Sequence, residues 1–107
     1  MVPLKTCSAT RAGELLREGA LMIDIREPHE FAGGHIGGAR NVPNSAVKEG
    51  KATGIAGRVV VFCCASGNRT MLNAEKLAAL VSGQGYILEG GLSAWRNAGL
   101  PVDGSGN

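Results

Sequence analysis

The sequence of 107 residues has few aromatic side chains and no apolar run long enough to cross a membrane. Aromatic residues make up 4% of the chain, so Val, Ile, Leu and Ala must supply most of the core. The apolar run at residues 59–65 has about a third of the ~20 residues that a spanning helix needs. The beginning of the chain shows no basic stretch followed by an apolar segment, which is the pattern of a secretory signal. We therefore expect a soluble globular protein.

The three cysteines, Cys7, Cys63 and Cys64, do not suit a fold that is held together by disulfides. Their number is odd, and a disulfide between the adjacent pair would close a strained ring. The two histidines, His29 and His35, have no metal-ligand spacing with the cysteines, so no metal site is predicted. Unpaired cysteines fit a reducing compartment, and we expect a cytoplasmic location.

The charge of the chain is small and evenly spread. A formal net charge of +2, with scattered Lys and Arg residues, does not produce the basic stripe of a nucleic-acid-binding protein. No nucleic-acid partner is predicted. The length fits a single domain covering residues 1–107. Its core is expected at about residues 4–102, and the tail, residues 103–107, is expected to be disordered.

Strands and helices are predicted to alternate along the chain. Apolar runs predict strands at residues 21–25, 39–42, 58–63 and 86–88. Caps and helical spacing predict helices at residues 8–18, 29–32, 70–82 and 92–98. Residues 44–57 show only a weak pattern. The alternation predicts an α/β fold with a parallel sheet that is covered by helices on both faces.

The predicted helix at residues 70–82 follows the strand with the strongest apolar pattern. Its apolar residues at helical spacing are Met71, Ala74, Leu77, Ala78 and Val81. We expect these side chains to pack on the sheet. Ligands of such sheets bind beyond the carboxyl ends of the strands, so the segment between this strand and this helix is the expected site.

A cysteine ends that strand and an arginine begins that helix. The small or turn-forming residues between Cys64 and Arg69 allow their N–H groups to curl towards one centre, with Gly67 free to take a positive φ. The beginning of the helix adds its positive end. This nest favours a thiolate, so Cys64 is the predicted nucleophile. The predicted anion-binding residues are Ala65, Ser66, Gly67, Asn68, Arg69 and Thr70. Strand alternation points Cys63 to the opposite face, where a structural cysteine is expected.

Three segments resemble the rhodanese-like family and occur in the order of that family. They are residues 21–31 with 34–39 (LMIDIREPHEF and GHIGGA), residues 59–70, and residues 90–95 with 99–102 (GGLSAW and GLPV). The resemblance implies a three-layer α/β fold whose central parallel sheet has about five strands. It also implies a sulfurtransferase that takes sulfane sulfur from a donor such as thiosulfate onto Cys64, as a persulfide, and passes it to cyanide or a thiol. No cofactor is implied.

The implied partners are a small-molecule sulfur donor and acceptor, with a protein thiol as an alternative acceptor. Residues 73–80 are similar to a bacterial subgroup in which this domain precedes a membrane hairpin. A membrane is therefore a partner, at its cytoplasmic face, only if the parent protein carries a C-terminal anchor.

Four further residues have both a functional and a structural interpretation. Asp24 and Arg26 lie on the same face at the carboxyl end of a predicted strand. Arg26 can attract an anionic donor, or the two side chains can pair with each other, and pairing is the favoured interpretation. His35 lies in a glycine-rich bend, and a backbone hydrogen bond is favoured over proton transfer. Trp95 can line a pocket rim but is expected to anchor the last helix in the core.

Three other functions compete with sulfur transfer. Binding modules of this fold have lost the cysteine, so the presence of Cys64 and Arg69 argues against that role. Related phosphatases and arsenate-type reductases separate cysteine and arginine by five residues, whereas this chain has four between them. A redox or nitrosation sensor would use Cys64, with Cys63 or Cys7 as its partner.

Overall fold

The computed structural model describes residues 2–49 and 59–103. Five parallel strands form the central sheet in the order β1-β6-β5-β2-β4. The strands are β1 (Lys5–Cys7), β2 (Leu21–Asp24), β4 (Arg40–Asn41), β5 (Val60–Cys63) and β6 (Gly85–Leu88). A separate antiparallel pair joins β3 (His35–Ile36) to β7 (Val102–Asp103). The predicted α/β class and its central parallel sheet are confirmed.

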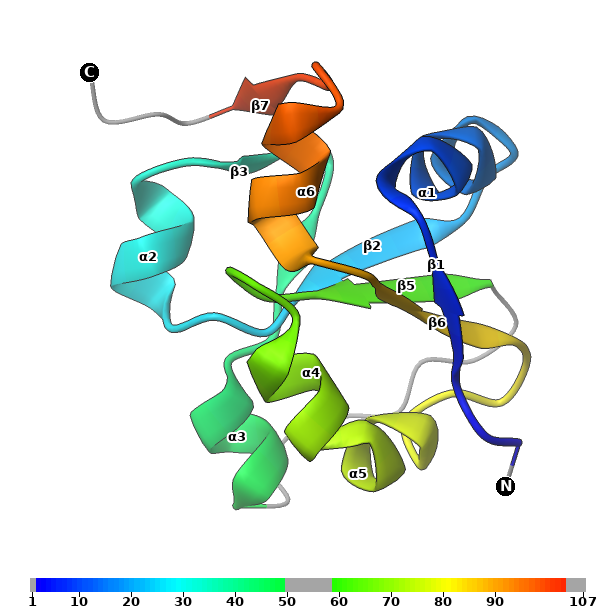
Figure 1. Ribbon diagram of the computed structural model, residues 1–107. Helices are drawn as coiled ribbons and strands as arrows, with labels where there is room; N and C mark the ends of the chain where they lie inside the picture. Colours follow the sequence, from blue (N-terminus) through cyan, green and yellow to red (C-terminus); the bar gives the residue numbers. More distant parts are fainter. Residues whose placement is uncertain (1, 50–58, 104–107) are drawn as a thin grey trace.

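Helices cover both faces of the sheet (Figure 1). They are α1 (Ala9–Arg17), α2 (Pro28–Ala32), α3 (Asn44–Lys48), α4 (Asn68–Leu72), α5 (Ala74–Ala78) and α6 (Gly91–Asn97). Helices α1 and α6 lie on one face, and α3, α4 and α5 lie on the other (Figure 1). Among the described residues, no helix is long and apolar enough to span a bilayer.

The central strand β5 divides its side chains between two cores. Val61 and Cys63 belong to the core under α1 and α6, whereas Val60 and Phe62 belong to the core under α3 and α5. All four residues of the strand are buried, which explains why its sequence is continuously apolar rather than alternating. Cys64 joins the second core. The prediction that Cys63 and Cys64 point to opposite faces is confirmed.

The first helix follows its predicted cap closely. Ser8 has extended backbone angles, and its hydroxyl accepts a hydrogen bond from the N–H of Arg11 at 3.1 Å. Substitution of such a cap by Ala costs about 1 kcal/mol. Because α1 leads directly from β1 to β2, this cap helps to fix the entry of the chain into the sheet.

The single helix predicted at residues 70–82 is wrong. The chain instead forms α4 and α5, which are separated by Asn73 with φ −112° and ψ 18°. The Asn73 side chain donates to the carbonyl oxygen of Arg69 at 2.8 Å, and such side-chain bonds compete with continuous helix geometry. The break leaves Met71 57% exposed, whereas Leu77 and Ala78 are buried as predicted.

Four short elements carried too weak a pattern to be predicted. They are β1, β3, α3 and β7. The expected disorder from residue 103 onwards does not hold for Asp103, which pairs with His35 across β7 and β3. The rest of that predicted tail, residues 104–107, and residues 50–58 lie outside the described residues.

Candidate active site

The candidate nucleophile lies at the carboxyl end of the central strand. Cys64 follows β5 and is 1% exposed. Its Sγ accepts a hydrogen bond from the N–H of Gly67 at 3.1 Å and lies 3.7 Å from Oγ1 of Thr70. The Thr70 hydroxyl also donates to the carbonyl oxygen of Gly67 at 2.8 Å. A hydroxyl has a single hydrogen, so it can serve either the carbonyl or a sulfur anion at one time.

The cysteine loop is shaped by glycine at the point where it turns into α4. Gly67, the N-cap of α4, has φ 96°, a value that non-glycine residues rarely adopt. A Cβ at this position would come within 3.2 Å of the backbone nitrogen of Gly90. The positive φ directs the Gly67 N–H to the sulfur, and the absence of a side chain lets the loop approach the turn before α6.

The beginning of α6 lies beside the cysteine loop (Figure 1). The N–H of Leu92 donates to the oxygen of Cys64 at 2.8 Å, and the N–H of Ser93 donates to the oxygen of Ala65 at 3.1 Å. These are N–H groups at the start of a helix that have no partner within it. Both carbonyls thereby anchor the loop to α6, and the N–H of Gly67 donates to the sulfur from the other end of the loop.

The guanidinium of Arg69 binds the carboxylate of Glu30 from α2. Nη1 lies 2.7 Å from Oε1, and Nη2 lies 2.9 Å from Oε2, so the pair is bidentate. The hydrogen bonds from Arg69, followed by the bond from the backbone of Glu27, lower the pKa of Glu30 to about 2. The sequence alone had assigned Arg69 to anion binding and had not singled out Glu30. One signal in the sequence could have pointed to Glu30. It lies three residues after Glu27, in the first turn of a helix that begins with Pro28.

Asp24 and Arg26 form a buried ion pair beside the end of β2. The Asp24 carboxylate accepts from Nη2 of Arg26 at 2.8 Å and from its backbone N–H at 3.0 Å. Nη2 also donates to the carbonyl oxygen of Gly34 at 2.7 Å. The pair therefore ties the end of β2 to the chain before β3, which is the structural role favoured from the sequence.

His35 and Trp95 are also held by backbone groups. Nδ1 of His35 lies 2.8 Å from the carbonyl oxygen of Phe31, and the two rings stack with centroids 3.8 Å apart. Nε1 of Trp95 donates to the carbonyl oxygen of Pro101 at 2.8 Å, and the side chain is buried. Both contacts agree with the structural interpretation of these residues.

The other two cysteines lie on the face opposite Cys64. Cys7 and Cys63 belong to the core under α1 and α6. Burial raises the pKa of Cys63 well above its usual value, with a further contribution from Asp24. Burial, together with Glu89, raises the pKa of Cys7 to about 11. These thiols are therefore poor nucleophiles, and the sheet separates them from Cys64.

The fold and the loop together define a class of protein. It consists of three-layer α/β domains in which a cysteine loop follows the central parallel strand and turns into a helix. Among the described residues, no His, Cys, Asp and Glu side chains are grouped as metal ligands. The chain belongs to the rhodanese-like domain family, whose model matches residues 8–98.

Individual relatives extend this assignment. The chain is 34% identical over 100 residues to the thiosulfate sulfurtransferase GlpE of Ectopseudomonas mendocina, covering 90% of this chain and 88% of that protein. It is 38% identical over 87 residues to the uncharacterized protein slr1261 of Synechocystis, covering 80% of this chain but 48% of that protein. A crystal structure of a rhodanese-related protein from Thermoplasma volcanium superposes with a TM-score of 0.81 at 28% identity, covering 94% of this chain and 98% of that one.

Proposed function

We propose that this protein is a thiosulfate sulfurtransferase that carries sulfur as a persulfide on Cys64. The observation that carries the proposal is the position of the Cys64 sulfur, which ends the central strand and accepts the N–H of Gly67 at 3.1 Å. The similarity to a protein named thiosulfate sulfurtransferase supports the donor. The free state of all three cysteines supports a cytoplasmic setting.

The first step transfers sulfur to the enzyme. The Cys64 thiolate attacks the outer sulfur of thiosulfate and forms a new S–S bond. The bond between the two sulfur atoms of thiosulfate breaks, and its electron pair leaves with sulfite. The product is a Cys64 persulfide that carries one negative charge at neutral pH, so no external oxidant or reductant is needed.

The second step returns the enzyme to its first state. A thiolate or cyanide attacks the terminal sulfur of the persulfide, and the electron pair of the broken S–S bond returns to Cys64 as a thiolate. Because the donor product leaves before the acceptor reacts, the kinetics should be ping-pong.

The loop residues have two tasks in these steps. The N–H of Gly67 stabilises negative charge on the sulfur through a bond that is already formed in the resting protein. The Thr70 hydroxyl can rotate from the Gly67 carbonyl to a sulfur anion, because both partners lie around the same oxygen. The loop has four residues between Cys64 and Arg69, and the resemblance assigns this length to sulfur transfer rather than to phosphate ester hydrolysis.

Mass spectrometry of the intact protein tests the proposal. Incubation with thiosulfate should add one sulfur, about 32 Da, to the wild type by the covalent mechanism. Cys64→Ser should gain nothing, whereas Cys63→Ser, which removes a sulfur from the other face of the sheet, should gain the same mass as the wild type. A wild-type protein without the adduct, or an adduct that persists in Cys64→Ser, would reject the Cys64 persulfide.

A further inference from the structure

Both cations of the predicted site are already paired with carboxylates. Arg26 is bound to Asp24 by a buried pair at 2.8 Å. Arg69 is bound to Glu30 by a bidentate pair whose side chains are 33% and 29% exposed. Only the Arg69 pair of these two is accessible to solvent, so an anionic donor that reaches Arg69 meets a guanidinium whose charge is largely cancelled.

The Glu30 carboxylate has a second hydrogen-bond partner besides Arg69. Its Oε1 accepts a hydrogen bond from the N–H of Glu27 at 3.0 Å. The Glu27 carboxylate in turn accepts from the hydroxyl of Ser45 at the beginning of α3 at 2.9 Å. The pair thus joins α2 to α4 through preorganised contacts, and the low pKa of Glu30 keeps the carboxylate charged at neutral pH.

Arg69 belongs to α4 (Asn68–Leu72), the helix that directly follows the cysteine loop. The hydrogen bonds that Arg69 donates to Glu30 are the main cause that raises the pKa of Arg69, and the charges of Glu30, Cys64 and Asp24 add to it. The net charge at this position therefore affects how strongly the site binds a donor with two negative charges.

We propose that Glu30 is a positioning residue that sets donor specificity: by neutralising Arg69 it lowers the reactivity of dianionic thiosulfate relative to that of monoanionic sulfur donors, such as thiosulfonates and thiol persulfides. The inference rests on the proposed sulfur transfer and deepens it. It assigns to Glu30 no contact with the donor, because Glu30 acts through the guanidinium that it binds.

Two donors with the same outer sulfur and different charge provide the test. Thiosulfate carries two negative charges and releases sulfite, whereas methanethiosulfonate carries one and releases methanesulfinate. The measured quantity is the ratio of kcat/KM for thiosulfate to kcat/KM for methanethiosulfonate, with cyanide as acceptor. In Glu30→Gln this ratio should rise about fivefold or more at low ionic strength, since Arg69 is then released from its carboxylate partner and its positive charge can turn to the donor. Added salt should reduce the increase.

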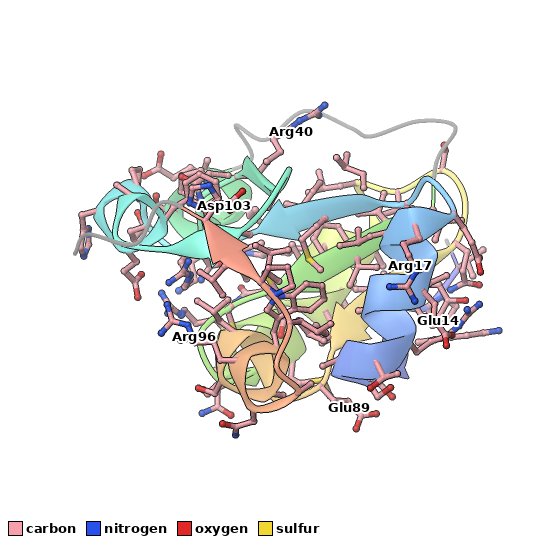
Figure 2. All side chains as sticks on the ribbon, turned by 90° about the horizontal axis from the view of Figure 1, so that it is seen from above. Glu14, Arg17, Arg40, Glu89, Arg96 and Asp103 are labelled. Atoms are coloured by element: carbon pink, nitrogen blue, oxygen red, sulfur yellow. The ribbon has the colours of Figure 1, made fainter. Side chains whose placement is uncertain are left out.

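Matched variants separate a charge effect from a structural effect. Glu30→Asp keeps the charge and should keep the ratio near that of the wild type. In the Arg69→Ala background, Glu30→Gln should leave the ratio unchanged, because the two residues act as a unit. Glu14→Gln removes a carboxylate from α1, which lies at the other end of the molecule from α2 (Figure 2), and should leave the ratio unchanged.

The outcomes distinguish this inference from the proposed function. A wild-type protein that gains no persulfide from either donor rejects the proposed function and the inference with it. Persulfide formation from both donors, with the same ratio in wild type and Glu30→Gln, rejects the inference alone. An equal loss with both donors assigns Glu30 a purely structural role, which also overturns the proposal. Glu30→Ala applies the same criterion if Glu30→Gln does not fold.

Discussion

Gly91 lies directly against the carbonyl oxygen of Cys64, so closely that a Cβ at residue 91 would collide with that oxygen. The same Cβ would also come within 2.8 Å of the carbonyl carbon of Ala65. With φ 57°, Gly91 begins α6 and places its first N–H groups on the cysteine loop. The position of the loop therefore depends on a glycine that is distant from it in the sequence.

Gly91→Ala should reduce sulfur transfer by about tenfold or more, since a displacement of the loop of about 1 Å misplaces the reacting sulfur. Gly99→Ala is the matched control, because Gly99 also has a positive φ, 78°, but has no atom within 4 Å of an added Cβ. Both variants should lose about 1 kcal/mol of stability from backbone strain. Steady-state rates and thermal unfolding measure the two effects. Wild-type turnover by Gly91→Ala would contradict the role of this contact.

Thr70→Val should slow sulfur transfer by about tenfold, because removal of one hydrogen-bond donor to a developing anion typically costs this much or more. The substitution keeps the buried shape but removes the hydroxyl that lies 3.7 Å from the Cys64 sulfur. Thr70→Ser retains the hydroxyl and should transfer sulfur at close to the wild-type rate. The rate of persulfide formation in a single turnover is the relevant measurement. Equal rates for the Val and Ser variants would show that the hydroxyl plays no part.

The Glu30–Arg69 pair should stabilise the fold in a pH-dependent way. The pKa of Glu30 falls from 4.5 to about 2 on folding because of the hydrogen bonds from Arg69. A lowered pKa means that the stabilisation is complete above the unfolded value and disappears as the pH falls through the folded one. The free energy of unfolding of the wild type should exceed that of Glu30→Gln by about 1 kcal/mol at pH 6, as for other partly exposed pairs.

Urea unfolding at several pH values measures this difference. It should decrease below pH 4.5 and approach zero near pH 2, the two pKa values that bound the titration of Glu30. Glu14→Gln is the control, because Glu14 forms an exposed ion pair with Arg11 on α1. The unfolding free energy of this variant should differ less from that of the wild type. A difference between wild type and Glu30→Gln that does not change with pH would contradict the assigned pKa.

The break between α4 and α5 predicts unequal costs for two apolar substitutions. Leu77→Ala should destabilise the protein by about 2–5 kcal/mol, because it opens a cavity under a fully buried side chain. Met71→Ala should cost less than about 1 kcal/mol, since the Met71 side chain is 57% exposed. Denaturant unfolding measures both. Similar costs at the two positions would indicate a continuous helix that buries Met71.

The main elements of the fold were predictable because each has a local cause. The Ser8 cap begins α1, and the continuous apolar run of β5 reflects burial on both faces. The strands β1, β3 and β7 have only two or three residues each. Such short strands exist through pairing with distant partners, as Cys7 pairs with Leu88, so a local pattern did not reveal them.

The sequence by itself determined the alternation of the main strands and helices, the place of Cys64 at the end of a buried strand, and the opposite orientation of Cys63, because apolar periodicity and strand alternation are local properties. Tertiary structure alone decided which distant residues hold the cysteine loop and its arginine. No local pattern in the sequence shows that Arg69 binds Glu30 or that Gly91 contacts Cys64. These partners come from segments far apart in the chain, and only the folded sheet brings their atoms within the few ångströms at which hydrogen bonds and steric contacts act.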